Sequence, residues 1–392
     1  MHRSFHTCRP KVCSRIIATP QATPQQPHYR PIANLAVPTL HKPAPNTPAT
    51  AAPTAPPGNS FRSSITSWDK GSIYKPISFC YFSTSTMSSE ASTSVHPIAN
   101  AFSTSGSSGL YERARPSYPP EALSKIFTAL HKSNDKNASG TGGINILELG
   151  AGTGIFTRLL ISPPPTTPEI PPVNKIVAVE PGPGMREGFV SALTKKGIPV
   201  GTTGTDGEEK VQILAGTFDS IPVGDGWADA VVIAQAFHWS HGHYENALKE
   251  IGRVLKPGAP LLLIWNLEDK SLPDYHPWVP KVRDIYEQFE KGTPQYRLGW
   301  WKAIFDLPEY SERFEKDYEE YEFKRLLSAT VDGVVTRILS KSYITALTDE
   351  EKVEVERQIR EVMERERKEW DDEGKGIFKF PYATDLYVIW RK

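Results

Sequence analysis

The chain has 392 residues and carries 45 basic and 45 acidic side chains, so its formal net charge is zero. This balance argues against a nucleic-acid partner held by bulk charge, and the absence of an apolar run long enough to span a bilayer argues against a membrane partner. All three cysteines lie before residue 100, which excludes a disulfide, a thiolate metal site and a cysteine nucleophile from the rest of the chain.

Residues 1–108 differ in composition from the rest of the chain. They are rich in Pro, Ser, Thr and Ala, and Asp69 is their first acidic residue. Such a segment buries too little apolar surface to offset the entropy of ordering it, so we expect it to be disordered. Its early arginines and serine-rich sequence resemble a mitochondrial transit peptide, but a solvated tail, or an extension upstream of a start at Met87, has the same composition. We therefore predict a cytoplasmic protein, with a mitochondrial location as the alternative.

An ordered domain is expected over residues 109–392. Two prolines at 119 and 120 suit the start of a helix over 121–131. From residue 144 onward, apolar strand patterns alternate with helical ones, and this βαβ rhythm predicts a Rossmann-like, doubly wound, mostly parallel α/β sheet. The predicted strands are 144–149, 175–180, 211–215, 228–234 and 261–265, and the predicted helices are 153–161, 184–195 and 244–255.

The remainder of the chain has a less regular pattern. A helix is predicted over 276–291, and an aromatic-rich segment follows over 293–310. The later expected elements are a strand over 323–328, a charged helix over 349–370 with Thr348 as its N-cap, and a terminal strand over 382–390. The alternating charges of that helix are typical of a solvated face.

A glycine-rich turn joins the first strand to the helix that follows it. Its glycines at 150, 152 and 154 permit tight bending and leave no Cβ where a ligand must approach. The helix start offers free N–H groups, which suit a polar ligand. The turn is therefore predicted to hold a cofactor against the backbone.

Polar side chains at the ends of later strands extend this predicted site. Glu180 closes the second strand, where a carboxylate can accept two hydrogen bonds from a ribose diol. The turns at 215–219 and 234–239 also leave carboxyl ends of strands, where ligands of open α/β sheets bind. A nicotinamide site would require glycine at 155, where the chain has Ile155, and a phosphate loop fails because no Gly-Lys-Ser/Thr follows.

These residues resemble the motifs of one enzyme family. Glu148-Leu-Gly-Ala-Gly-Thr-Gly154 resembles the first motif of class I S-adenosylmethionine-dependent methyltransferases, and Val177-Ala-Val-Glu-Pro-Gly-Pro-Gly-Met185 resembles the second. Arg253-Val-Leu-Lys-Pro-Gly258 is similar to the turn before the fifth strand. Tyr111-Glu-Arg-Ala-Arg-Pro-Ser-Tyr-Pro119 and Ala236-Phe-His-Trp239 resemble the type 11 group, including the trans-aconitate methyltransferase-like proteins.

The resemblance covers about residue 110 to the C-terminus and implies an architecture. It implies a seven-stranded sheet whose last strand is antiparallel, with a helical cap from residues 109–120 and about 272–342. It also implies S-adenosylmethionine as the cofactor. Metal ligands are not expected, because the spacing of His238, His241 and His243 matches no standard zinc signature.

The resemblance assigns cofactor roles position by position. Glycine backbone would lie against the methionine part and the ribose, Glu180 would hold the ribose hydroxyls, and Met185 would flank the adenine. In many relatives an acidic residue after the third strand meets the adenine amine; here that place holds Thr217, and Asp219 comes two residues late. The residues expected to bind the cofactor are Tyr111, Glu148, Gly150, Gly152, Gly154, Glu180, Pro181, Met185, Thr217, Phe218 and Gln235.

The acceptor is expected to be a small molecule. The cofactor's sulfonium already carries an activated methyl group, so the enzyme aligns the acceptor and excludes water. A carboxylate acceptor needs no base, whereas a hydroxyl acceptor is helped by one, and His238 is the candidate catalytic residue. The alternative for His238 is packing with Trp239 as a pocket wall.

Arginines of the lead-in segment suit bidentate pairing with a carboxylate. The alternative for Arg113 and Arg115 is an ion pair with Glu112 or Glu121, and for the aromatic residues it is ordinary packing. The residues expected to bind substrate are Arg115, Tyr118, His238, Trp239 and Trp300.

The sequence thus predicts an S-adenosylmethionine-dependent methyltransferase that moves a methyl group to a carboxylate or hydroxyl of a small molecule. It is expected to be a monomer or weak homodimer. The alternative function is a non-catalytic S-adenosylmethionine-binding or partner-binding protein on the same fold, because fold does not imply function.

Overall fold

A computed structural model describes residues 107–137, 143–202 and 208–392. The predicted disorder and transit peptide in residues 1–106 lie outside the described residues. Residues 107 and 108, which the sequence placed in the disordered segment, already belong to a helix. Within the described ranges, no helix combines the length and hydropathy needed to cross a bilayer.

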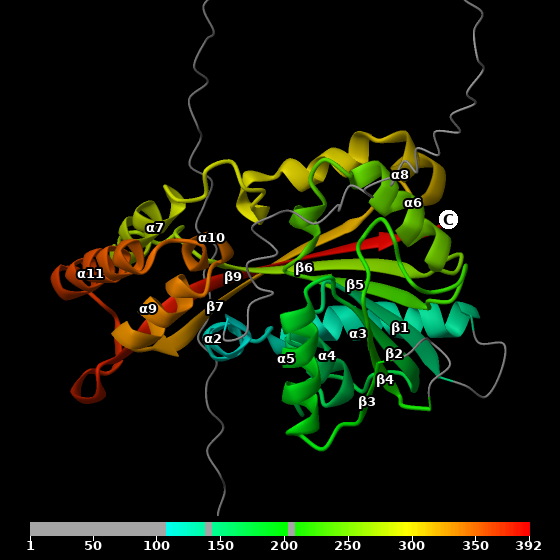
Figure 1. Ribbon diagram of the computed structural model, residues 1–392, viewed down its shortest axis with the longest axis horizontal. Coiled ribbons are helices and arrows are strands. Elements are labelled where there is room, and N and C mark those ends of the chain that lie inside the picture. The colour runs from blue at the N-terminus through cyan, green and yellow to red at the C-terminus, as the bar shows by residue number, and fades with distance from the viewer. Residues whose placement is uncertain (1–106, 138–142, 203–207) are drawn as a thin grey trace, which may run out of the picture. The chain divides into compact units, whose positions relative to one another are not determined.

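One mixed sheet forms the centre of the fold (Figure 1), and over the described residues its strand order is β3-β4-β2-β1-β5-β6-β9-β7, with β8 paired to β9. The strands are β1 (Ile144–Leu149), β2 (Val173–Val179), β3 (Val200–Gly201), β4 (Val211–Leu214), β5 (Ala230–Ala234), β6 (Pro260–Glu268), β7 (Glu319–Ala329), β8 (Trp370–Asp372) and β9 (Ile377–Trp390). The pairs from β3 to β6 are all parallel. The predicted alternation of strand and helix is therefore confirmed.

The C-terminal strand β9 runs antiparallel to both of its neighbours, β6 and β7. Strand β7 is consequently parallel to β6, so the predicted mostly parallel sheet with an antiparallel last strand is confirmed. The seven long strands match the expected number, and the short strands β3 and β8 are additions that the sequence did not predict.

Helices and short 3-10 segments surround the sheet. The α-helices are α2 (Ser107–Ala114), α3 (Pro120–Asn137), α4 (Ile155–Ile161), α5 (Pro183–Thr194), α6 (Tyr244–Val254), α7 (Trp278–Glu287), α8 (Pro308–Arg313), α9 (Val331–Leu339), α10 (Ser342–Thr345) and α11 (Asp349–Arg365). The 3-10 segments are η2 (Phe237–Ser240), η3 (Tyr296–Leu298), η4 (Trp300–Asp306) and η5 (Glu373–Lys375).

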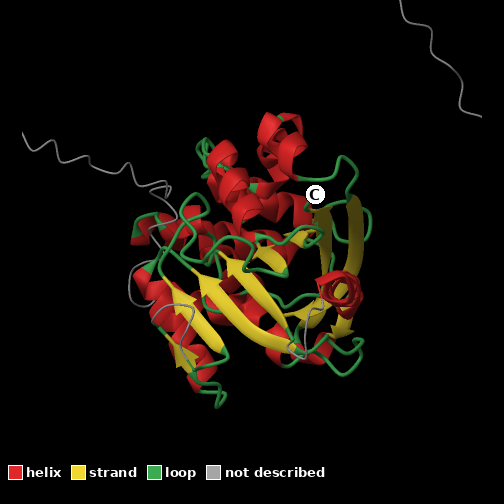
Figure 2. Ribbon diagram, turned by 90° about the vertical axis from the view of Figure 1, so that its right-hand side faces the viewer, coloured by secondary structure: helices red, strands yellow, loops and turns green. Residues whose placement is uncertain are grey.

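Alternate residues of the central strands point to two separate cores, as the two-residue period of a strand requires. In β1, Ile146 packs with α3 and α4 side chains such as Phe127 and Phe156. The next residue, Leu147, faces the other core with Leu248 of α6. Helices therefore cover both faces of the sheet (Figure 2), and the parallel strands are buried on both sides.

A helical lobe, made of α7, α9, α10 and α11, packs against the first part of β9 (Figure 1). Its core includes Trp278 of α7, Ile338 of α9 and Phe380 of β9. Helix α11 belongs to this lobe although it lies beyond the predicted cap limit at about 342. Strand β7 lies inside the predicted cap limits but is a strand of the sheet.

Several element boundaries differ from the predicted ones for tertiary reasons. Helix α3 continues past residue 131 to Asn137, because Ser133 is buried and donates a hydrogen bond to the carbonyl of Asp229 at 2.6 Å. Strand β6 extends to Glu268 because β9 pairs with it along its whole length. The lead-in at 107–114 is helical, and α9 and α10 were not predicted.

Candidate functional site

The glycine turn after β1 requires glycine for conformational and steric reasons. Gly150, Gly152 and Gly154 have φ values of +69°, +56° and +78°, which L side chains rarely adopt. A Cβ on Gly150 would lie 2.5 Å from the Cβ of Ala236, and one on Gly154 would lie 2.8 Å from the Phe189 ring. On Gly152 the nearest atom would be the Tyr111 ring at 3.9 Å, so the turn leaves open space there.

Glu180 joins this turn to the one that follows β2. Its Oε2 accepts a hydrogen bond from the Gly152 N–H at 3.0 Å, and its Oε1 accepts one from the Gly182 N–H at 2.9 Å. Burial raises the pKa of Glu180 against the lowering effect of these two hydrogen bonds. Each carboxylate oxygen keeps acceptor capacity beyond its backbone bond, so Glu180 can also receive hydroxyl donors.

A first cavity opens between these two turns and the ends of β4 and β5. It brings together nine residues that the sequence predicted: Tyr111, Gly150, Gly152, Glu180, Pro181, Met185, Thr217, Phe218 and Gln235. Further lining residues that the prediction omitted include Gly182, Asp219, Ser240 and His243. The carboxyl ends of four strands thus meet at one elongated cavity.

Asp219 reaches this cavity because the chain turns back on itself after β4. Thr217 and Ser220 form an isolated antiparallel bridge, and the Thr217 hydroxyl donates to Oδ1 of Asp219 at 2.6 Å. This tight turn brings an acidic side chain to the cavity although it stands two residues later than in the family pattern. The position in sequence alone could not reveal the turn.

Two predicted cofactor residues do not line the first cavity. Glu148 is buried and accepts a hydrogen bond from the Thr157 hydroxyl at 2.5 Å. Burial raises the pKa of Glu148 to about 8. Gly154 packs against Phe189 instead of facing open space. Both residues thus contact the α4 and α5 side of the turn.

A second cavity adjoins the first through three shared residues, Tyr111, Gln235 and Trp239. It contains the predicted substrate residues Arg115, His238 and Trp239. Its other polar lining residues come from segments far apart in the sequence: Asn266, Tyr286, Glu287, Glu290, Gln295, Tyr296, Arg297, Arg337, Lys341, Ser342 and Tyr343.

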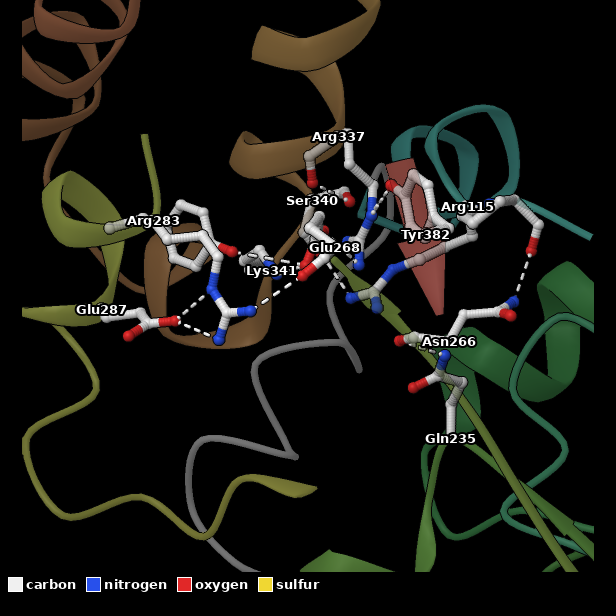
Figure 3. A network of polar contacts seen from close by, with 12 residues as sticks. Arg115, Gln235, Asn266, Glu268, Arg283, Glu287, Arg337, Ser340, Lys341 and Tyr382 are labelled. Atoms are coloured by element: carbon white, nitrogen blue, oxygen red, sulfur yellow. Dashed lines mark hydrogen bonds and ion pairs between the residues drawn. The ribbon is translucent and has the colours of Figure 1, made fainter. Parts of the chain in front are cut away.

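The carboxylate of Glu268, at the end of β6, anchors a buried charge network beside this cavity (Figure 3). Its Oε1 lies 2.9 Å from Nη2 of Arg337, and its Oε2 lies 3.2 Å from Nζ of Lys341. Arg283 donates to the backbone carbonyl of Glu268 at 2.8 Å. Burial alone would raise the pKa of Glu268, but Arg337 and Lys341 together lower it well below its usual range.

The basic side chains of this region outnumber the carboxylates that pair with them. Arg283 pairs with Glu287 at 2.6 Å, and Arg297 pairs with Glu290. Glu268 is shared by Arg337 and Lys341, and the Arg115 guanidinium donates to the carbonyl of Ser340 at 3.2 Å and pairs with no carboxylate of the described residues. Among the described residues of the network, five basic side chains therefore face three carboxylates.

The pKa values of two of these cations, Arg115 and Lys341, are lowered by burial and by the neighbouring positive charges. Burial lowers the pKa of Lys341 to about 7, against the attraction of Glu268. Burial and the neighbouring Arg337 lower the pKa of Arg115 as well. An anion bound in the second cavity would relieve this repulsion, because opposite charge favours the protonated form of each cation.

Gln235 is held in a strained backbone conformation where the two cavities meet. Its φ of +61° is unusual for a residue other than glycine, and its Nε2 donates to the carbonyl of Asn266 at 2.9 Å. Asn266 in turn donates to the carbonyls of Pro116 and Ser117 at 3.3 and 3.2 Å. The junction is therefore tied to the lead-in segment that carries Arg115 (Figure 3).

Three predicted residues lie elsewhere. Trp300 lines neither cavity; it is exposed, and its ring lies tilted against the His241 ring with centroids 4.9 Å apart. Tyr118 packs edge-on against Phe156 and lines a smaller cavity beside Glu148. Arg113 is exposed on α2. The described residues hold no group of three or more His, Cys, Asp or Glu side chains that could bind a metal ion.

Only weak sequence signals pointed to the residues that line the second cavity in place of Trp300 and Tyr118. Arg337 and Lys341 lie in α9 and in the short link to α10, for which no helix was predicted. Tyr296 and Arg297 belong to the same aromatic segment as Trp300, but a 3-10 turn and Gly299, with φ of +72°, reorient the chain between them. Tertiary packing alone decides which of these side chains faces the cavity.

The sheet topology, the glycine turn and the bridging carboxylate of Glu180 together define a class I S-adenosylmethionine-dependent methyltransferase fold and site. Comparison with known proteins agrees. Residues 147–263 match a family model described as a methyltransferase domain. An uncharacterized methyltransferase-like protein of Schizosaccharomyces pombe is 33% identical over 252 residues, covering 64% of this chain and 82% of that protein.

An uncharacterized methyltransferase of Mycobacterium bovis is 34% identical over 177 residues, which span 45% of this chain and 56% of that protein. Among solved structures, the YcgJ protein of Bacillus subtilis aligns over 68% of this chain and 98% of its own, with 18% identity and a TM-score of 0.39. The chain belongs to the class I S-adenosylmethionine-dependent methyltransferase family.

Proposed function

We propose that the protein transfers a methyl group from S-adenosylmethionine to a carboxylate of a small anionic molecule bound in the second cavity. The observation that carries this proposal is the imbalance of five basic side chains against three carboxylates in and beside a cavity that shares Gln235 with the cofactor cavity. Buried cations without matching anions are costly unless a ligand supplies the missing charge.

The first cavity fits the cofactor on two observations. Gly152 leaves open space beside the turn, and the oxygens of Glu180 keep acceptor capacity toward that space. In this proposal, Glu180 holds the ribose hydroxyls and Asp219 takes the adenine amine that relatives bind with an acidic residue. The cofactor supplies an activated methyl group, so the protein needs only to position the acceptor and exclude water.

In the second cavity, Arg115, Arg337 and Lys341 bind and orient the anionic acceptor. Arg115 keeps its Nε without a partner in a buried position, which leaves this donor for a ligand oxygen. Tyr111, Gln235 and Trp239 line both cavities and so lie between the bound acceptor and the cofactor in this proposal. This anionic preference also agrees with the resemblance to the trans-aconitate methyltransferase-like group.

The test is a methyl-transfer assay with the full chain, labelled S-adenosylmethionine and two matched panels of small molecules, carboxylic acids and the corresponding alcohols or amides. We expect label only in the acids, as esters identified by mass. Label confined to the alcohols would overturn the carboxylate acceptor. Cofactor binding without transfer to a metabolite extract would favour the alternative, a non-catalytic protein.

A further inference from the structure

We propose that His238 serves the acceptor as a fixed hydrogen-bond donor through its Nε2–H, and that Trp265 is the positioning residue that holds His238 in this tautomer. This inference rests on the proposed function for its ligand, and its structural part can be tested without one. It replaces the role of general base that the sequence suggested for His238.

The tautomer follows from one contact. The indole Nε1 of Trp265 lies 3.2 Å from Nδ1 of His238. An indole nitrogen can only donate, so Nδ1 must accept. A neutral imidazole carries one proton, which therefore sits on Nε2.

Trp265 is held rigidly enough to impose this choice. Its side chain is fully buried in β6 and stacks on Tyr296 with ring centroids 4.4 Å apart. The ring centroid of Trp301 lies 4.8 Å from that of Trp265 in the same aromatic cluster. Tyr296 is itself held in place, because its hydroxyl donates a hydrogen bond to Asp385 at 2.5 Å. Rotating the indole away from His238 would disturb this whole aromatic stack.

Neither nitrogen of His238 is then available to take a proton. Nδ1 is occupied by the indole, and protonating it would set two donors against each other. Burial and the nearby Arg115 lower the pKa of His238 to about 3, which agrees with a permanently neutral ring. Nε2 has no hydrogen-bond partner among the described residues, and the side chain lines the second cavity.

The position of this donor gives it a function. His238 shares the cavity with Arg115, Arg337 and Lys341, so its N–H adds a neutral donor to a set of cationic ones. The three cationic side chains and this N–H suit an oxygen that is already ionised, and His238 itself offers no nitrogen to remove a proton from a hydroxyl. His238 would therefore select the ionised acceptor and orient it.

The first experiment is nitrogen NMR of the full chain labelled at histidine. For His238 we expect a protonated Nε2 and an unprotonated Nδ1 from pH 5 to 8. Trp265→Phe removes the indole donor and should release a mixture of both tautomers. Trp278→Phe is the matched control, because the buried Nε1 of Trp278 has no hydrogen-bond partner among the described residues and its ring packs in the helical lobe instead of the Trp265 cluster, so it should leave the His238 signals unchanged.

A proton on Nδ1, or titration of His238 between pH 6 and 8, in the wild-type chain would overturn the proposal. This readout needs no acceptor, so it stands even if no acid is methylated. If no acid is methylated, the proposed function fails, but the NMR spectra still show which nitrogen of His238 carries the proton.

The second experiment uses substitutions of His238 to distinguish a hydrogen-bond donor from a general base. It does not require the Trp265→Phe variant to fold. A glutamine amide can place a donor near Nε2, whereas an asparagine amide reaches only toward Nδ1. We expect His238→Ala and His238→Asn to lower kcat/KM for the acid by roughly 10- to 150-fold, the loss of one hydrogen bond to a charged group. His238→Gln should recover most of that loss. Equal losses in all three variants would contradict a donor role.

Discussion

At the scale of single residues, the buried carboxylate of Glu268 holds together the charge network beside the second cavity. It lies within ion-pair distance of both Arg337 and Lys341 and stays ionised because of them. Removing such an anion would leave two buried cations unpaired, which costs several kcal/mol. Glu268 thus allows the cavity to hold more positive charge than it could otherwise tolerate.

Lys341 should make acceptor binding depend on pH. Because its pKa is lowered to about 7, Lys341 is charged at pH 6 and mostly neutral at pH 8. KM for an acid should therefore rise about tenfold over this range as one charged hydrogen bond is lost. Lys341→Arg keeps the charge and should flatten the rise, and Lys341→Met should give a high KM at every pH. If KM changes with pH in the same way in the wild type and in Lys341→Met, this role of Lys341 is contradicted.

Glu148 should make stability fall as the pH rises. Its pKa is about 8 in the folded chain and 4.5 when unperturbed, so between these values the folded state holds a proton that the unfolded state has lost. This group's contribution to stability is fully present below pH 4.5 and declines by ~1.4 kcal/mol per pH unit up to about pH 8.

The substitution Glu148→Gln removes this titration while keeping an acceptor for the Thr157 hydroxyl. Urea unfolding at pH 5 and pH 7.5 should show a smaller difference in the free energy of unfolding for the variant than for the wild type. The same difference in both proteins would show that Glu148 is ionised in the folded state.

At the scale of elements, α11 shows how a charged sequence can still build a core. Most of its residues are charged, but Val355, Ile359 and Met363 repeat every four positions and are buried against the helical lobe. A stripe this narrow suffices to attach a helix on one face. The helix ends at Arg365 because the chain then enters β8, which pairs with β9.

The start of α11 depends on a capping box. The Thr348 hydroxyl accepts from the Glu351 N–H at 3.2 Å, and the Glu351 carboxylate accepts from the Thr348 N–H at 2.9 Å. Thr348→Ala should lower the free energy of unfolding by about 1 kcal/mol. Val353→Ala, at a strongly exposed position of the same helix, is the control and should change it by less than about 0.5 kcal/mol. If denaturant unfolding shows the same loss of free energy for Thr348→Ala and Val353→Ala, the capping box does not stabilise the helix as expected.

At the scale of the whole molecule, the two cavities join segments that are distant in sequence. The second cavity alone is lined by α2, by the turn after β5, by the end of β6, by α7 and by the link between α9 and α10. A ligand bound there contacts both the sheet and the helical lobe, and a ligand in the adjoining first cavity contacts α2 and the turns at the ends of the strands. Binding should therefore stabilise the folded state as a unit.

Cofactor binding should be visible as thermal stabilisation of the full chain. S-adenosylhomocysteine at 100 times its Kd should add ~2.7 kcal/mol to the free energy of unfolding and raise Tm by several degrees. Glu180→Ala should abolish most of this shift, because it removes the carboxylate that faces the cavity from the second turn. NAD should give no shift. A shift that survives in Glu180→Ala would remove the role proposed for this residue.

The sequence by itself determined the sheet and the glycine turn. The apolar strands at 144–149 and 230–234 and the glycines at positive φ are local requirements, since each follows from residue type and spacing over a few positions. Glu180 was also predictable, because the end of a parallel strand always faces the ligand edge of such a sheet.

Only the tertiary structure decided the lining of the second cavity. Arg337 and Lys341 meet Glu268 because α9 and α10 fold back onto the end of β6, and the 3-10 turn at Gly299 leaves Trp300 outside. The contact of Trp265 with His238 likewise joins β6 to the turn after β5. Charge networks and tautomers depend on distances between segments that no local pattern contains, so the glycine turn and Glu180 can be predicted from the sequence while the lining of the second cavity cannot.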